Sequence, residues 1–263
     1  MSKQALKSIH KLINMAVQEA PVEQQFLRDL KASIEMVDAK ISRKPSQCYK
    51  PSSLKCIRNM YFQVAGVDED PERGNSCLIG ICESGTDRHE RIQSAISNMK
   101  EAGMDCEYIN VADYIKENGL DYLEIKGRTN FETKLYYPAL NLSFLCDGII
   151  KYPGKYYILE IKTETIYKWQ TREGVADEHL EQACAYSVSL GLSDVMFLYE
   201  NRDNCDKKAF LLHVTEEMKN TLVSKIEECD SYVTNLIPPP KPEVSKKTCS
   251  YCKYKQACKK AGA

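Results

Sequence analysis

A carboxylate and a lysine stand two residues apart at the end of a short apolar run. The run Tyr156–Leu159 predicts a buried strand, and Glu160, Ile161 and Lys162 follow it directly. Because side chains alternate along a strand, Glu160 and Lys162 share one face and Ile161 points to the other. Charges at a buried strand end are costly unless they are paired or take part in chemistry. This pair is therefore the first candidate for a catalytic site.

An aspartate lies on a second strand-like run, Leu142–Ile150, and a turn signal at Tyr152–Lys155 separates the two runs. If Tyr152 pairs with Lys155 across the turn, Asp147 lies directly opposite Glu160. Cross-strand neighbours have Cβ atoms roughly 5 Å apart, which suits two carboxylates that share one divalent cation. The Pro-Gly pair in the turn favours type II over the primed turns that fit hairpins best, so a slipped register is the alternative.

A second candidate site lies near the C-terminus. Cys249, Cys252 and Cys258 occupy a short lysine-rich segment that could not bury a core unaided. Closely spaced thiolates in such a segment predict a metal centre, and zinc and an iron–sulfur cluster both fit the spacing. The fourth ligand has to come from elsewhere, and Cys56 is the natural candidate, although a lone cysteine is more often a small buried hydrophobe. Unconnected cysteines in a flexible tail are the alternative.

Three further polar side chains lie on predicted helices. His89 follows a predicted helix start near Ser84 or Thr86. A lone histidine is more often a hydrogen-bonded structural residue than a ligand, but neutral imidazole is a common metal ligand. Gln182 and Tyr186 are four residues apart on another predicted helix, so both reach the same face.

The single tryptophan, Trp169, lies between Lys168 and Arg172 in a polar connection. These side chains could stack on and grip a single-stranded nucleic acid, and a capped loop is an equally good interpretation. The acidic residues of the segment 103–140 are scattered in the manner of a solvated surface. None of them is predicted to be catalytic.

Composition limits the classes of function. A chain of 263 residues can bury a full core in one large domain with small appendages. The net charge of −1 gives no global basic field, so any nucleic-acid site must be local. No apolar run is long enough for a membrane span, and no apolar signal core is present, so a cytoplasmic location is expected. Twelve cysteines in such a chain indicate thiols or metal ligands rather than disulfides.

The apolar spacing predicts a sheet with helices packed on it, hence an α/β fold. A helical hairpin is expected over residues 1–44, and a helix with a serine N-cap within 51–62. Strands are expected at 194–200 and 208–214, and a long helix at 215–236.

Taken together, the motifs resemble the PD-(D/E)xK nuclease superfamily, and within it the RecB-type exonucleases that carry an iron–sulfur cluster. Nucleases of CRISPR adaptation modules and their phage-encoded relatives belong to that group. The segment Gly85–Glu90 is similar to the family's histidine motif, Asp147 to its second motif, and Glu160-Ile161-Lys162-Thr163 to its third. Gln182 and Tyr186 resemble the helix motif of the RecB branch. Cys56, Cys249, Cys252 and Cys258 resemble the cysteine set of the cluster-bearing members.

The resemblance covers residues 51–258 and departs from the family at two places. Cys146 stands before the motif aspartate, where the superfamily name has proline, and residues 1–44 have no counterpart. The implied architecture is restriction-endonuclease-like, with a mixed central sheet flanked by helices. The implied division is a helical extension at 1–44, a nuclease core at 45–237, and a cysteine-cluster segment at 238–263 that closes onto Cys56.

The resemblance also implies cofactors and roles for the site residues. His89, Asp147, Glu160 and the backbone carbonyl of Ile161 would hold Mg²⁺ or Mn²⁺. Lys162 would position or deprotonate the attacking water, and Gln182 and Tyr186 would steady the site. The four cysteines would hold a 4Fe-4S cluster of structural function, with zinc as the alternative occupant.

The implied function is that of a metal-dependent DNA exonuclease, acting on single strands or duplex ends in recombination, replication or phage DNA processing. Partner proteins from those processes or a homo-oligomer would fit this function, and a membrane would not. Two alternatives stay open. The chain could be a DNA-binding or assembly protein whose cleavage is secondary, or a zinc-stapled protein of other function.

Overall fold

The computed structural model describes residues 21–40, 46–70 and 76–262, which form two units. The first unit holds helix α2 (Val22–Ala39) and the first residues of α4 (Ser76–Ser97). Helix α2 confirms the second half of the predicted helical region. Its first half lies outside the described residues. Within this unit the backbone N–H of Ser76 donates to Glu35 Oε1 at 3.0 Å, so a glutamate of α2 satisfies a free donor at the start of α4.

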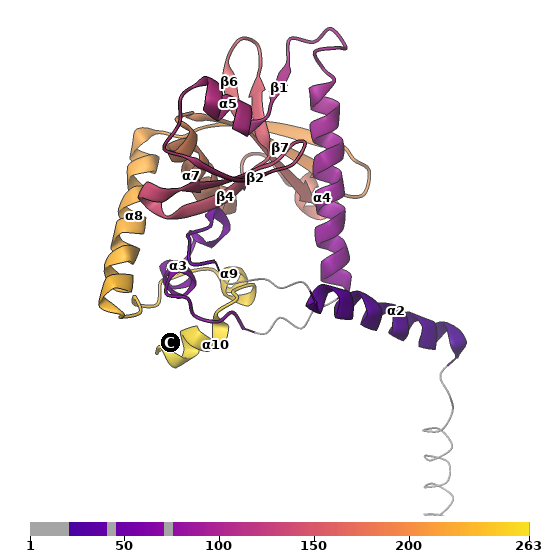
Figure 1. Cartoon of the computed structure of the whole chain (residues 1–263). Coiled ribbons are helices and arrows are strands. Elements are labelled where there is room, and N and C mark those ends of the chain that lie inside the picture. The colour runs from indigo at the N-terminus through magenta and orange to yellow at the C-terminus, as the bar shows by residue number, and fades with distance from the viewer. Residues whose placement is uncertain (1–20, 41–45, 71–75, 263) are drawn as a thin grey trace, which may run out of the picture. The chain divides into compact units, whose positions relative to one another are not determined.

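The second unit is built on a five-stranded mixed sheet in the order β1-β5-β6-β7-β8 (Figure 1). Its strands are β1 (Glu107–Ile109), β5 (Gly148–Lys151), β6 (Tyr156–Glu164), β7 (Asp194–Asn201) and β8 (Lys207–His213). Strands β6 and β7 are parallel, and the other neighbours are antiparallel. A second, three-stranded antiparallel sheet contains β2 (Glu124–Arg128), β3 (Thr133–Tyr137) and β4 (Leu142–Cys146).

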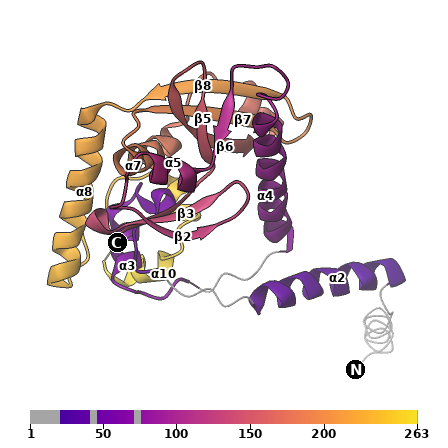
Figure 2. The same ribbon diagram turned by 45° about the horizontal axis from the view of Figure 1, so that its top comes forward.

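Helices cover both faces of the five-stranded sheet. On one face, Ile92 of α4 packs against Leu159 and Ile161 of β6. On the other side lie α7 (Leu180–Leu190) and α8 (Glu216–Asn235) (Figure 2). Side chains of these helices and of the sheet, Phe197 among them, form the larger core. The predicted α/β fold with a central mixed sheet flanked by helices is confirmed.

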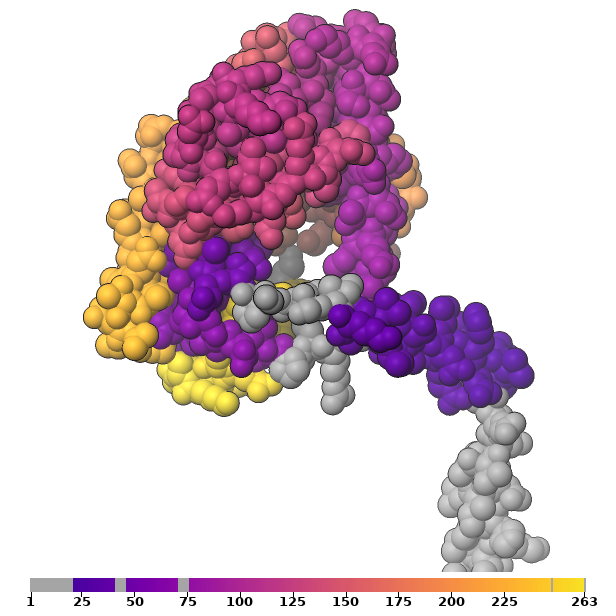
Figure 3. Space-filling view, in the orientation of Figure 1, coloured from indigo at the N-terminus to yellow at the C-terminus, as the bar shows by residue number. Residues whose placement is uncertain are grey.

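The remaining helices are short. They are α3 (Ile57–Val64), α5 (Val111–Glu117), α6 (Ile166–Gln170), α9 (Lys246–Ser250), α10 (Lys255–Lys260), and the single 3₁₀ turns Pro51–Ser53, Pro138–Leu140 and Asp177–His179. In the space-filling view, the atoms of α3 and of the C-terminal residues lie against one another (Figure 3). Arg58 of α3 explains this contact, because it is buried and donates to the carbonyls of Pro239 and Ala261 at 2.7 and 3.2 Å.

The predicted hairpin register is confirmed. Gly148 pairs with Leu159 and Ile150 with Tyr157, and the N–H of Tyr152 donates to the carbonyl of Lys155 at 2.8 Å. Gly154 has φ +69°, which is the positive φ that a type II turn requires after proline. The turn therefore keeps the register that the strand pattern predicts.

Three local predictions are wrong. The run Leu142–Ile150 is two strands in different sheets, because the chain leaves one sheet at Cys146 and enters the other at Gly148. Helix α4 begins at Ser76, well before Ser84, because Gly85 is accommodated inside the helix instead of ending it. Cys56, rather than a serine, is the N-cap residue of α3, since the preceding serines form a separate 3₁₀ turn.

Candidate metal site

Asp147 lies at the junction of the two sheets. In the smaller sheet Thr133 pairs with Cys146, and in the larger one Gly148 pairs with Leu159. If the β3–β4 pairing continues by one residue, Glu132 lies opposite Asp147. If the β5–β6 pairing continues by one residue, Glu160 lies opposite Asp147. The junction therefore lies beside acidic residues from three successive strand segments.

The backbone at Asp147 is held in place by two side chains of neighbouring elements. Its carbonyl accepts hydrogen bonds from Tyr108 Oη at 2.6 Å and from Gln93 Nε2 at 2.7 Å. The next residue, Gly148, has φ +152°, and a Cβ atom there would lie 2.5 Å from the Tyr108 ring. Only glycine allows the chain to turn between the sheets so close to this tyrosine.

The two carboxylate oxygens of Asp147 face different groups. Oδ1 lies 3.2 Å from His89 Nδ1, and Oδ2 accepts the backbone N–H of Ile161 at 2.6 Å. Helix α4 therefore brings the predicted histidine to the predicted aspartate. The Ile161 contact shown here is made by its amide, and a role for its carbonyl stays a prediction.

Ligand atoms of His89, Glu132 and Asp147 all lie within 4.8 Å of one another, a spacing that could hold a cation. Glu132 corrects the prediction that no acidic residue of the segment 103–140 belongs to a site. Burial, followed by the charge of Asp147, raises the pKa of Glu132. The sequence carried one signal for it, because the pairing of β3 with β4 puts residue 132 beside Asp147, but the pairing itself was not predicted.

Glu160 and Lys162 lie on one face of β6, as predicted, and form an ion pair. Gln182 of α7 bridges the pair, since its Nε2 donates to Glu160 Oε1 at 2.7 Å and its Oε1 accepts from Lys162 Nζ at 3.0 Å. The same Nε2 lies 2.6 Å from Tyr186 Oη, which donates to the carbonyl of Leu145 at 2.9 Å. Gln182 and Tyr186 of α7 thus hold the Glu160–Lys162 pair in place through hydrogen bonds.

The pKa shifts follow from this burial and pairing. Burial raises the pKa of Glu160 to about 7, although the Lys162 ammonium acts in the opposite direction. Burial alone would lower the pKa of Lys162, but the Glu160 carboxylate outweighs it and the pKa is raised. Likewise, the pKa of His89 is raised because Asp147 outweighs the effect of burial.

The four predicted cysteine ligands also come together. Cys56, Cys249, Cys252 and Cys258 line one cavity of about 440 Å³. In the part of the chain that the structure describes, lysines and apolar side chains are its other main lining groups, and no carboxylate takes part. All four are free thiols, and Arg58 Nη1 lies 3.4 Å from Cys258 Sγ. Residues from opposite ends of the second unit therefore share one thiol-rich site.

Trp169 is a structural residue in this fold. It lies on α6, its half-buried ring packs against the main core, and Lys208 Nζ lies 4.4 Å from the ring centroid. Lys208 also donates to the carbonyl of Trp169 at 2.8 Å and so satisfies the end of this short helix. Of the two interpretations of Trp169, the structure favours the capped connection.

Comparisons with known proteins give structural similarities only. No family model matches the chain, and no curated protein matches its sequence. Among solved structures, the protein SSO0001 aligns over 92% of this chain and 98% of its own, at 15% identity and a TM-score of 0.43. An alkaline exonuclease from Laribacter hongkongensis aligns over 73% of this chain and 92% of its own, at 12% identity and a TM-score of 0.40. The same exonuclease in complex with dAMP aligns with a TM-score of 0.41. Scores of this size do not establish a shared fold, so the functional conclusion rests on the geometry of the site.

We expect Glu132→Gln to lower the affinity for Mn²⁺ by about tenfold or more, because a neutral amide replaces a carboxylate of the His89–Glu132–Asp147 group. Isothermal titration of the metal-stripped protein measures this. The matched control is Glu124→Gln, which changes a half-exposed carboxylate of β2. Equal Mn²⁺ affinity for the wild type and Glu132→Gln would show that Glu132 is not a metal ligand.

Proposed function

We propose that this protein is a metal-dependent DNA exonuclease. One observation carries the proposal: Asp147 belongs to the group with His89 and Glu132 and also accepts the amide of Ile161, which lies between buried Glu160 and half-buried Lys162. Carboxylate oxygens are the ligands that Mg²⁺ and Mn²⁺ prefer, and an imidazole favours Mn²⁺ somewhat. The resemblance of the sequence motifs to RecB-type exonucleases supports DNA as the substrate.

A bound divalent cation would polarise the scissile phosphate and lower the pKa of its water. His89, Glu132, Asp147 and Glu160 would hold it. Lys162 stays protonated beside Glu160, so its role in this arrangement is to orient the attacking water and to offset negative charge on the phosphate. Gln182 keeps the lysine in place, and Tyr186 in turn keeps Gln182 in place.

The proposal is tested by incubating anaerobically purified protein with end-labelled single-stranded and duplex DNA, with Mg²⁺, Mn²⁺ or EDTA. We expect stepwise release of labelled nucleotides with either metal and none with EDTA. A closed circular DNA serves as the control, because an exonuclease needs an end. Cutting of the circle at the same rate would change the assignment to an endonuclease, and no release from any substrate would refute a nuclease.

We further propose that the four cysteines hold a 4Fe-4S cluster. The lining of the cavity supports a thiolate-bound metal centre, because four thiols face it and, within the described ranges, no carboxylate does. The resemblance of the cysteine spacing to the cluster-bearing nucleases favours the iron–sulfur cluster over zinc.

We expect Cys56→Ser to abolish the visible absorption of the cluster and to lower the free energy of unfolding by about 3–5 kcal/mol. The reason is that the cluster joins residue 56 to the C-terminal segment and so constrains a very long loop of the unfolded chain. Absorption spectra and denaturant unfolding under anaerobic conditions measure both effects. Cys48→Ser is the control, since Cys48 is a half-buried thiol outside the cavity. Colourless wild-type protein with one equivalent of zinc would contradict the cluster.

A further inference from the structure

A group of three cations surrounds one buried carboxylate next to the metal site. Glu200 of β7 is fully buried. Arg91 Nη2 lies 2.7 Å from both of its oxygens, Arg88 Nη1 lies 3.0 Å from Oε1, and Lys207 Nζ lies 3.2 Å from Oε2. We call these four residues the Glu200 cluster.

The Glu200 cluster has more positive charge than a buried carboxylate needs. One guanidinium with two hydrogen bonds already pairs such a group. Among the described residues, Glu200 is the sole carboxylate within ion-pair distance of Arg88, Arg91 and Lys207. Within these four residues three cations face one anion, an excess of two positive charges on a chain whose net charge is −1. The cluster is therefore a candidate for the local basic site that the overall composition does not show.

The excess charge faces solvent. The side chain of Arg91 is 49% exposed and that of Lys207 is 39% exposed, whereas Glu200 is inaccessible. Arg91 donates to Glu200 through Nη2 alone, so its Nε and Nη1 groups make no hydrogen bond to Glu200. Phosphate oxygens, like carboxylate oxygens, are anionic groups that a guanidinium fork and an ammonium bind well.

The position of the cluster relates it to the metal site. Arg88 directly precedes His89 on α4, and Arg91 follows it by two residues. The helix is thus anchored to Glu200 by Arg88 and Arg91 and to Asp147 by His89 and Gln93. The phosphates that neighbour the one at the metal site along a DNA strand would pass near the flank of the same helix.

On this geometry we propose that Arg91 and Lys207 bind backbone phosphates of the DNA substrate, next to the phosphate that is hydrolysed. The inference rests on the proposed nuclease function. Glu200 holds the two cations in position, so they bind DNA without having to be ordered first. Contacts of this kind position the strand and do not read its sequence.

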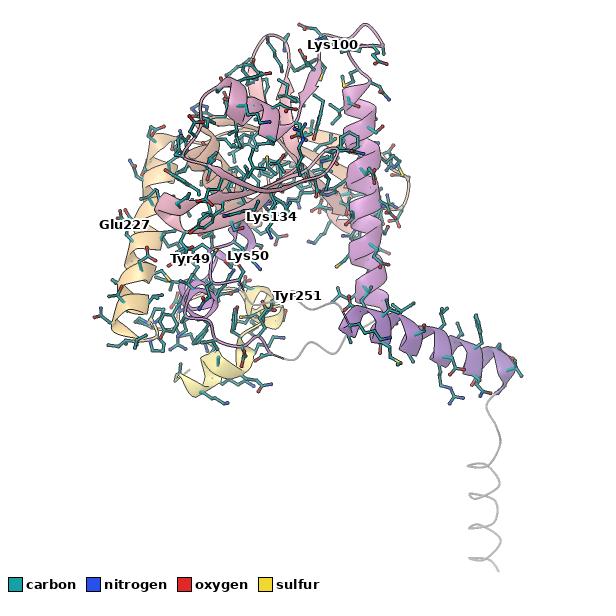
Figure 4. The ribbon with its side chains drawn as sticks, viewed as in Figure 1. Tyr49, Lys50, Lys100, Lys134, Glu227 and Tyr251 are labelled. Carbon is teal, nitrogen blue, oxygen red and sulfur yellow. The ribbon has the colours of Figure 1, made fainter. Side chains whose placement is uncertain are left out.

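The test measures DNA binding by fluorescence anisotropy in the Lys162→Ala background with Ca²⁺, so that cleavage does not interfere. We expect Arg91→Ala and Lys207→Ala each to weaken binding by about tenfold, and each to reduce the slope of log affinity against log salt by about one. The matched controls remove the same charges elsewhere. Arg128→Ala breaks a surface pair with Asp113, and Lys100→Ala changes a residue just beyond the C-terminal end of α4 (Figure 4).

The outcomes separate the two levels of the proposal. Unchanged affinity and salt slope in Arg91→Ala and Lys207→Ala, with a lowered unfolding midpoint, would mean that the cluster only anchors α4. An equal loss in Arg128→Ala and Lys100→Ala would also overturn the proposal, because the effect would then be one of general charge. A parent protein that binds no DNA would refute the nuclease proposal itself.

Discussion

Lys162→Ala is expected to lower the rate of DNA hydrolysis by about 10²–10⁴-fold while the protein still binds Mn²⁺. The ammonium of Lys162 is paired with Glu160 and held by Gln182, so its removal takes a fixed positive charge from the reacting phosphate. The metal ligands stay. Glu160 keeps its hydrogen bond from Gln182 Nε2, so the buried carboxyl group retains a partner and the fold should survive.

Single-turnover cleavage of end-labelled DNA gives the rate, and titration calorimetry gives the Mn²⁺ affinity. Lys168→Ala is the matched control, since it removes a half-exposed lysine whose Nζ lies 3.6 Å from Glu178 Oε1, in a surface ion pair. Hydrolysis by Lys162→Ala at the wild-type rate would exclude the lysine from the reaction. A joint loss of Mn²⁺ binding and hydrolysis would instead assign it to the architecture of the metal site.

Asp147→Asn is expected to remove both metal binding and hydrolysis, with an affinity loss of at least about a hundredfold. Asp147 is the residue that both ladders bring to the junction, and its carboxylate contacts His89 and the Ile161 amide. Asparagine keeps the shape of the side chain. Its oxygen can accept from Ile161, and its amide can donate to a neutral His89, so the backbone at the junction should hold.

The control for this substitution is Asp113→Asn, which breaks only the exposed pair with Arg128. Thermal unfolding of all three proteins shows whether the junction survives. An Asp147→Asn protein that folds like the wild type and still binds Mn²⁺ tightly would place the cation elsewhere.

The part of the site that lies on one hairpin could be predicted from the sequence. The turn and the strand alternation fixed the register of β5 with β6, and spacing four residues apart placed Gln182 and Tyr186 on one face of α7. These are short-range relations, set by backbone geometry and by few residues. The resemblance to the cluster-bearing nucleases predicts that Cys56 lies beside the three C-terminal cysteines. Their spacing alone does not identify the fourth ligand.

Another part of the site depends on a second hairpin, which the apolar pattern does not predict. Glu132 reaches Asp147 because β3 pairs with β4 in the smaller sheet. The break at Asp147 is marked in the sequence by the Asp-Gly pair, a turn signal inside a largely apolar run. In the structure Gly148 takes a positive φ and lies close to the Tyr108 ring at this point. Helix α4 runs through a Ser-Gly-Thr sequence that is typical of a helix start, and side chains further along it, such as Arg88 and Gln93, make its contacts with the sheet.

The central claim is that a cation held at the Asp147 junction hydrolyses DNA. The most direct measurement follows Mn²⁺ occupancy by electron paramagnetic resonance and cleavage of end-labelled DNA in the same samples, as Mn²⁺ is added to metal-stripped protein. The account predicts that the cleavage rate rises in proportion to bound Mn²⁺ in the wild type, and that Asp147→Asn shows neither signal. DNA cleavage that persists in EDTA, or that is unchanged in Asp147→Asn, would contradict it.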